Sequence, residues 1–252
     1  MTLRLDELLT QYGLDSDVTD LGTDKRTIHS YIEFLYQPYF DTFGPPQSLL
    51  EIGVFRGASL VLWKLAFPEA KILGADINME PTLNPLAITF YQNRDIELIF
   101  GDAYLDEFWF EIKNQFDLII DDGPHTLESQ LEILNRIQFL NENGTLIIED
   151  IAHGWSTLQA LRRKADETAH GKFAFLDLAW KKGRFDDLVL IVSNNPMVIE
   201  WVTDSNSKIL SFMTRYRVSY TVYQCLRVFR AAHYKVGRRL RKLLSSNYFM
   251  DR

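Results

Sequence analysis

Two short apolar runs of this chain each end in a cluster of acidic residues. The first run, Phe116–Asp121, continues into Asp122-Gly123-Pro124-His125, and the second, Gly144–Glu149, continues into Asp150. Apolar runs of this length are typical of buried strands in a parallel sheet. Ligands of open α/β sheets bind outside the carboxyl ends of the strands. The two runs therefore predict neighbouring strands that bring carboxylates and one histidine to the same edge of a sheet.

The chain alternates further candidate strands with candidate helices. Before the two runs we expect strands at 48–53, 71–76 and 96–100, and after them at 172–178 and 188–193. Helices are expected at 58–67, 104–114, 126–140 and 155–168. A short polar stretch joins the last two strands, which favours a hairpin over a parallel crossover. The pattern predicts an α/β fold with a mostly parallel sheet, an antiparallel last strand and helices on both faces.

The composition narrows the class of protein. No uncharged apolar run reaches 18 residues, so we expect no membrane-spanning helix. The first residues lack the basic-then-apolar pattern of a signal peptide. Cys225 is the single cysteine, so no internal disulfide can form. We therefore expect a cytoplasmic protein.

Acidic and basic side chains are distributed unevenly along the chain. Residues 1–204 carry 33 acidic and 16 basic side chains, whereas residues 205–252 carry 11 basic side chains and one acidic one. We expect a helical segment at 1–46, a central domain at 47–204 and a basic amphipathic helical extension at 205–252. The extension suits anionic lipid at the inner membrane surface. The alternatives are a solvated helix, or a helix docked on the acidic body of its own chain or of a neighbouring subunit in a homo-oligomer. Nucleic-acid binding is not expected, because the rest of the chain is acidic and carries no recognition motif.

A glycine-containing turn follows the first predicted strand. It reads Glu51-x-Gly53-x-x-x-Gly57-Ala58-Ser59 and leads directly into a helix. Gly53 allows a tight turn and a close backbone approach, and the amides of the following helix point toward a ligand. Phe55 stands where a dinucleotide fingerprint has its second glycine. This substitution disfavours a nicotinamide dehydrogenase.

Two further acidic positions favour a nucleoside ligand. Asp76 ends the second strand, where a carboxylate can accept hydrogen bonds from both ribose hydroxyls. Gly101-Asp102 follows the third strand, where an adenine amino group could be held. The set indicates adenosine without phosphate. The alternative is that these glycines serve ordinary turns and these aspartates cap helices.

The ordered set resembles class I S-adenosylmethionine (SAM) methyltransferases across residues 48–193, which implies a Rossmann-like seven-stranded sheet with an antiparallel last strand. A narrower resemblance rests on Gly22-Thr23-Asp24-Lys25, His29-x-Tyr31, the Glu-Ile-Gly-Val turn, Asp-Asp-Gly-x-His and Ile-Glu-Asp. These motifs are similar, in this order, to those of mycinamicin-type sugar O-methyltransferases and of the cephalosporin hydroxylase-like methyltransferase group. Pro124 and 152–155 depart from that pattern on the acceptor side.

The resemblance implies a role for each matching residue. SAM is expected at Thr23, Lys25, His29, Tyr31, Glu51, Gly53, Gly57, Ser59, Asp76, Asp102 and Asp121. Asp122, Glu149 and Asp150 are expected to hold Mg²⁺ or another divalent cation, and His125 is the expected general base. Hard oxygen ligands suit Mg²⁺, and a bound cation lowers the pKa of a hydroxyl that histidine can then deprotonate.

We therefore expect a SAM-dependent O-methyltransferase that acts on a hydroxyl of a sugar or glycan. The alternatives are a phenolic or other small-molecule acceptor, or a non-catalytic SAM-binding module. The site residues also have plain structural interpretations. Asp122 could cap helix 126–140, Glu149 and Asp150 could cap the next helix, and the segment 22–31 could merely pack the first helix. His153 lies close enough in sequence to compete with His125 for the role of base.

Overall fold

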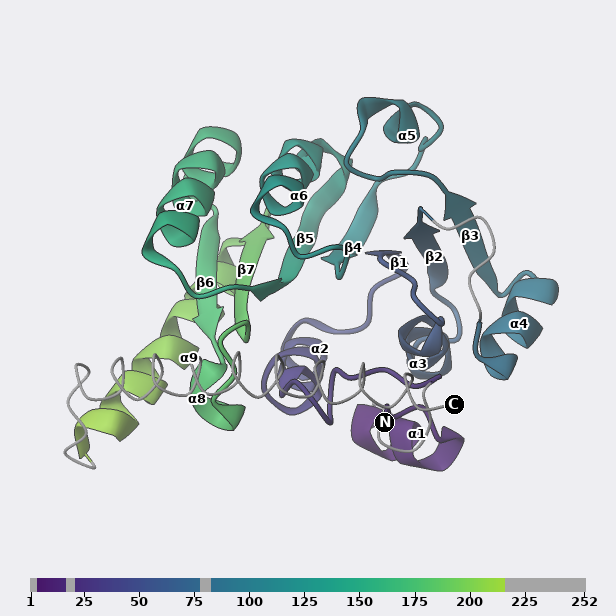
Figure 1. Ribbon diagram of the computed structural model, residues 1–252, viewed down its shortest axis with the longest axis horizontal. Helices are drawn as coiled ribbons and strands as arrows, with labels where there is room; N and C mark the ends of the chain where they lie inside the picture. The colour runs from purple at the N-terminus through teal and green to yellow at the C-terminus, as the bar shows by residue number, and fades with distance from the viewer. Residues whose placement is uncertain (1–3, 17–20, 78–82, 216–252) are drawn as a thin grey trace, which may run out of the picture.

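The computed structural model describes residues 4–16, 21–77 and 83–215 (Figure 1). The predicted amphipathic part of the basic extension falls in 216–252 and lies outside these ranges. The last described helix, α9 (Pro196–Arg215), runs without a break through residue 204. Within the described ranges, no helix combines the length and the apolar character that crossing a bilayer requires.

Seven strands form one sheet. They are β1 (Ser48–Ile52), β2 (Lys71–Asp76), β3 (Ile96–Phe100), β4 (Phe116–Asp121), β5 (Leu140–Ile151), β6 (Phe173–Asp177) and β7 (Leu188–Ser193). Their order is β3-β2-β1-β4-β5-β7-β6, and β7 alone runs antiparallel to both of its neighbours. This arrangement confirms the predicted Rossmann-like, mostly parallel sheet. The strands are added outward in one direction from β1 to β3 and in the other direction from β4 onward, so the strand order reverses between the parallel neighbours β1 and β4. Sheets of this kind open a crevice for ligands at that point.

The register of the central strands aligns their carboxyl ends. Ile52 of β1 pairs with Asp121 of β4, and Asp121 in turn pairs with Ile148 of β5. Ile52 is followed by Gly53, Asp121 by Asp122, and Ile148 by Glu149. The turn glycine and the acidic residues therefore emerge at one level of the sheet.

Helices cover both faces of the sheet, as predicted (Figure 1). One face carries α1 (Leu5–Tyr12), η1 (Ile32–Tyr36), α2 (Gln37–Phe43), α3 (Ala58–Ala66), α4 (Pro85–Gln92) and α9. The other carries α5 (Asp106–Phe110), α6 (Leu127–Glu132), the 3₁₀ helix η2 (Ile133–Phe139) and α7 (Trp155–Ala169). Strand residues alternate between the two cores: Ile120 packs with the first and Ile119 with the second. Burial on both faces explains why the strands are continuously apolar.

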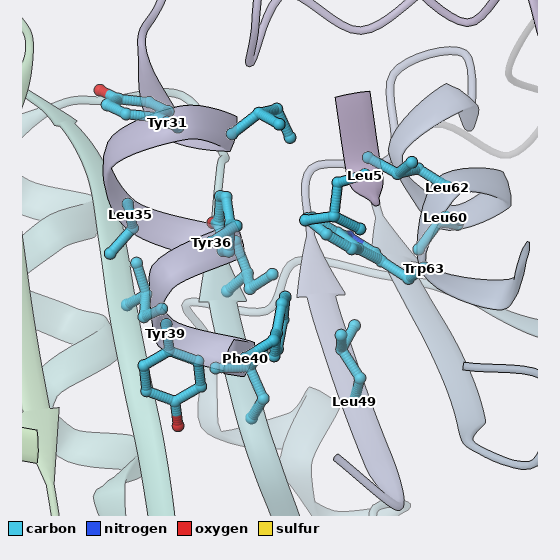
Figure 2. Packing of buried hydrophobic residues seen from close by; sticks show 14 of the residues in the cluster. Leu5, Tyr31, Leu35, Tyr36, Tyr39, Phe40, Leu49, Leu60, Leu62 and Trp63 are labelled. Atoms are coloured by element: carbon cyan, nitrogen blue, oxygen red, sulfur yellow. The ribbon is translucent and has the colours of Figure 1, made fainter. Parts of the chain in front are cut away.

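The N-terminal helices pack on α3 through aromatic side chains (Figure 2). Trp63 of α3 is fully buried, and its ring centroid lies 4.9 Å from that of Tyr36 and 6.0 Å from that of Phe40. The Trp63 indole N–H donates a hydrogen bond to the Glu51 carboxylate at 3.0 Å. The N-terminal layer therefore reaches the end of β1, where the site begins.

Several element boundaries differ from the sequence prediction. The predicted helix 126–140 is α6 followed by a 3₁₀ turn, and β5 begins four residues earlier than expected. The polar residues 141–143 obscured that start, although Leu140 already pairs with Phe116. Helix α4 was not predicted, although Asn84 caps it and Pro85 opens it. A short helix, α8 (Ala179–Lys182), occupies the predicted β6–β7 loop.

Gly74 of β2 provides a test of how closely β2 and α3 pack. A β-carbon at this position would lie 2.6 Å from a Leu60 methyl group and 2.8 Å from a Val54 methyl group. We expect Gly74→Ala to lower the free energy of unfolding by about 1 to 3 kcal/mol in urea titrations, because a packed core resists added volume.

Gly154→Ala is the matched control for this substitution. Gly154 has φ −152°, and the nearest atom to an added β-carbon is the Thr157 Oγ1 at 3.3 Å, on a side chain that can rotate. The control should change the free energy of unfolding by about 0.5 kcal/mol or less. Equal effects of the two substitutions would contradict the proposed close packing at Gly74.

Candidate functional site

A cavity of about 580 Å³ opens at the carboxyl ends of β1 and β4. Its volume lies in the usual range for sites that bind small molecules. The predicted site residues that line it are Thr23, Gly53, Gly57, Ser59, Asp122 and His125. The structure thus brings the N-terminal segment, the glycine turn and the residues after β4 to one cavity.

The glycine turn has a backbone that only glycine fits. Gly53 has φ +90°, and a β-carbon there would lie 2.0 Å from the Asp122 carbonyl oxygen. The Asp76 carboxylate accepts hydrogen bonds from the amides of Val54 at 2.9 Å and Phe55 at 3.1 Å. Asp76, at the end of the neighbouring strand β2, therefore holds the turn after β1 in place. Asp76 is also the residue predicted to contact a ribose.

Asp122, His125 and Asp150 come together beside the cavity. One ligand atom from each residue lies within 4.8 Å of those of the other two. His125 Nε2 is 3.6 Å from Asp122 Oδ1 and 3.9 Å from Asp150 Oδ2. His125 and Asp150 both have φ 54°, a backbone conformation that side chains other than glycine rarely adopt and that often marks functional sites. Two carboxylates and an imidazole at this spacing fit the ligand preferences of a divalent cation.

Buried partners orient the Asp150 carboxylate. Tyr31 donates a hydrogen bond to Asp150 Oδ1 at 2.6 Å, and His29 Nδ1 lies 3.3 Å from the same oxygen. His29 Nδ1 is also 2.6 Å from Asp187 Oδ1. Burial raises the pKa of Asp150 to about 6, while the nearby His29 opposes that rise. Burial alone would lower the pKa of His29, but the hydrogen bond to Asp187 and the charge of Asp150 raise it above its usual value.

Glu149 lies outside the Asp122, His125 and Asp150 cluster. Its carboxylate is fully buried and accepts hydrogen bonds from the Lys25 ammonium and, at 2.5 Å, from the Tyr36 hydroxyl. Burial raises the pKa of Glu149, and the charge of Lys25 opposes that rise. The structure therefore brings together two of the three predicted metal ligands with the predicted base, and pairs the third with a lysine.

The other predicted cofactor residues are not among the residues that line the cavity, and they have protein partners. Asp121 is buried and accepts a hydrogen bond from the Tyr104 hydroxyl at 2.5 Å. Asp102 accepts one from the Tyr104 amide at 2.9 Å. Lys25, His29 and Tyr31 are buried, and their side chains contact carboxylates of the site.

The segment 22–31 is held across the site by contacts at both ends. Near its start, the Thr23 amide donates to the Leu14 carbonyl at 2.7 Å. Near its end, the Lys182 ammonium donates to the carbonyls of Arg26, Thr27 and His29. The segment therefore does more than pack the first helix, because it brings Lys25 and His29 to the carboxylates.

The helix-cap interpretations are wrong for the acidic residues. The side chain that caps α6 is that of Thr126, which accepts from the Ser129 amide. Helix α7 follows Gly154 and has no side-chain cap. His153, the competing base, is buried with its Nε2 3.3 Å from Asp177 Oδ1.

Sequence reasoning missed four residues that complete the site. Tyr36 contacts Glu149, and Tyr104 contacts Asp121. Lys182 contacts the backbone carbonyls of residues 26, 27 and 29, and Asp187 contacts the His29 side chain. None lies in a motif, and most contact partners more than 100 residues away in the chain. Short-range sequence patterns carry no signal for such pairs.

One family model matches the central part of the chain. Residues 45–152, less than half of the chain, match the model of a family described as O-methyltransferase. This segment runs from just before β1 to just after β5 and contains the glycine turn and both acidic clusters. No curated protein sequence matches the chain.

Solved structures resemble the chain at low sequence identity. A structure named cmcI-D160 Mg-SAM is 21% identical over 64% of this chain and 72% of that chain, with a TM-score of 0.47. SAH-bound Podospora anserina methyltransferase PaMTH1 is 18% identical over 77% and 88%, with a TM-score of 0.45. Thermotoga maritima spermidine synthase is 16% identical over 60% of this chain, with a TM-score of 0.44, and this chain spans 55% of its length.

Asp121 makes the stability of the protein depend on pH. Burial raises its pKa to about 7, whereas an aspartate in an unfolded chain titrates near 4. Between these values the native state keeps a proton that the unfolded state releases, so this residue lowers the free energy of unfolding as the pH rises. Asp121→Asn removes the effect and keeps an acceptor for Tyr104.

We expect the free energy of unfolding of the Asp121→Asn variant, relative to that of the wild type, to increase by about 2 kcal/mol from pH 5 to pH 7. Urea titrations at intermediate pH values measure this difference directly. A difference that stays constant over the range would show that Asp121 is already ionised at pH 5.

Proposed function

We propose that this protein is a SAM-dependent O-methyltransferase that methylates a hydroxyl of a sugar or glycan with the help of a divalent cation. One observation carries the proposal: Asp122, His125 and Asp150 cluster beside a cavity that the Gly53–Ser59 turn lines. The match of residues 45–152 to an O-methyltransferase family supports the same reaction. The sugar acceptor rests on the sequence motifs.

The residues around the cavity fit the methyl donor. Gly53 lets the turn pass directly beside the backbone that follows β4, because any side chain there would collide with the Asp122 carbonyl. Ala58 and Ser59, the first two residues of α3, line the cavity. Asp76 holds the turn in shape. SAM bound here would supply the electrophilic methyl group.

Asp122 and Asp150 would hold the divalent cation. Each offers an oxygen to the cluster, and such hard ligands suit Mg²⁺. When bound, the cation would act as a Lewis acid that lowers the pKa of the acceptor hydroxyl. Tyr31 and His29 fix the orientation of Asp150, so the cluster is organised before the acceptor arrives.

His125 would take the proton of the acceptor hydroxyl. Its side chain is about one third exposed and lines the cavity, so an acceptor can reach it. Its Nε2 lies within 4 Å of both Asp122 and Asp150, so the proposed base stands beside the two proposed ligands of the cation.

The reaction can be tested with methyl-labelled SAM and a panel of acceptors. We expect label in saccharides that carry vicinal hydroxyls when Mg²⁺ is present, and a loss of labelling in EDTA that added Mg²⁺ reverses. Label in phenols alone would replace the acceptor class. Labelling that survives EDTA would remove the cation from the mechanism. SAM binding without label in any acceptor would favour a non-catalytic module.

The role of His125 can be tested with a substitution that keeps its backbone. Asparagine tolerates the left-handed conformation that His125 adopts, so His125→Asn should fold normally. We expect kcat to fall by about 10² to 10⁴-fold, the usual contribution of a general base. The matched control is His170→Asn, because His170 is exposed at the end of α7 and also has positive φ.

The control variant should keep the activity of the wild type within about twofold. Equal activity of the two variants would exclude His125 as the base. A pH profile adds a second readout: the rise of kcat with pH that a histidine base produces should disappear in His125→Asn and persist in His170→Asn.

A further inference from the structure

Lys25 is a buried cation with no contact to bulk water. Its side chain is 1% exposed, and its Nζ lies 2.7 Å from Asp122 Oδ2 and 3.4 Å from Glu51 Oε1. It also forms an ion pair with Glu149 Oε2. A buried amine this close to carboxylates from three strands serves as their counter-ion.

The three carboxylates around Lys25 come from three adjacent strands. Glu51 lies in β1, Asp122 directly follows β4 and Glu149 lies in β5. The Lys25 ammonium donates hydrogen bonds to Asp122 and Glu149 and forms an ion pair with Glu51. The segment that carries Lys25 is tied down on both sides, so the lysine has a fixed position between the strand ends.

Lys25 divides the acidic residues into two groups. Both oxygens of Glu149 are in use, one by Lys25 and the other by Tyr36. Asp122 is shared, since Oδ2 faces Lys25 and Oδ1 lies on the His125 side. Asp150 is 3.9 Å from His125 and is held by Tyr31.

We propose that Lys25 is a resident cation of the metal site that keeps Glu149 out of the ligand shell and leaves Asp122 and Asp150 as the carboxylate ligands of a single divalent ion. The inference rests on the metal part of the proposed function. It assigns Lys25 a positioning and charge-balancing role instead of a contact with SAM. The lysine limits metal affinity, because it neutralises part of the acidic cluster and occupies Glu149.

The first test leaves Lys25 in place and changes Glu149. Mn²⁺ is the probe, titrated into the full chain and followed by calorimetry and by the electron paramagnetic resonance signal of the free ion. We expect Glu149→Gln to change the Mn²⁺ dissociation constant by about threefold or less, because a residue outside the ligand shell acts only through its charge. Asp150→Asn, which removes a ligand, should weaken binding by about 100-fold or more. A loss in Glu149→Gln as large as that in Asp150→Asn would overturn the proposal.

The second test removes the lysine charge and keeps its length. We expect Lys25→Met to bind Mn²⁺ at least about tenfold more tightly, because Glu149 is then free and the cluster is more negative. The double variant Lys25→Met/Glu149→Gln should lose most of that gain. Tighter binding in Lys25→Met that persists in the double variant, or no gain at all, would overturn the proposal. If Lys25→Met does not fold, the Glu149→Gln measurement decides the question alone.

Metal binding separates this inference from the proposed reaction. Mn²⁺ binding with the expected variant pattern, but without methyl transfer, would uphold the role of Lys25 and contradict the proposed function. A wild-type chain that binds no Mn²⁺ would contradict the inference, whatever the Lys25→Met variant does, and would remove the cation from the proposed mechanism.

Discussion

The buried ion cluster around Lys25 is the interaction on which the site depends. Parallel strands in register carry Asp122 and Glu149 to one level of the sheet, with Glu51 of β1 two residues before that level. Glu51 and Glu149 are fully buried, and the three negative charges repel one another. Carboxylates in such a place are costly unless a cation and hydrogen-bond donors accompany them. Lys25 supplies the cation, and Trp63 and Tyr36 supply donors to Glu51 and Glu149.

The need for a cation and hydrogen-bond donors explains why N-terminal residues contact the acidic residues of the sheet. The donors Lys25, Tyr31 and Tyr36 all come from the first 36 residues, and their acceptors lie on β5 or directly after β4. Lys182, from the connection between β6 and β7, holds the 26–29 carbonyls from the other side. A site built only from the strand ends would have no counter-ion. The N-terminal segment is therefore a structural part of the site as well as its cover.

Two kinds of acidic residue result from this arrangement. Glu51 and Glu149 face inward, are fully buried and serve the internal ion cluster. Asp122 and Asp150 are partly exposed and lie beside His125, next to the cavity. Positive φ at Asp150 and His125 turns the chain at these points, a strain that the surrounding contacts hold in place. The adjacent residues Glu149 and Asp150 thus have different chemical roles.

Local patterns in the sequence determined the type of fold and predicted that the site lies at the carboxyl ends of the strands. Apolar runs predict buried strands, and the turn Glu51-x-Gly53-x-x-x-Gly57 predicts a backbone opening, because both depend on neighbours in the chain. These features placed β1, β4 and β5 within a few residues, and they made Asp122, His125 and Asp150 candidate site residues, which the fold brings close together. Boundaries such as the start of β5 were missed, because pairing with Phe116 outweighs the polar character of 141–143.

Only the tertiary structure determined which charged side chains pair with one another. Lys25 and Glu149 are 124 residues apart, and His29 and Asp187 are 158 residues apart, so no short pattern connects them. In the sequence, Glu149 and Asp150 are equivalent candidates for the metal. In the fold, the peptide turn between them directs Glu149 toward Lys25 and Tyr36, and Asp150 toward His125 and Tyr31. The sequence determines which types of residue lie at the site, whereas the partner of each of these residues depends on how distant segments pack.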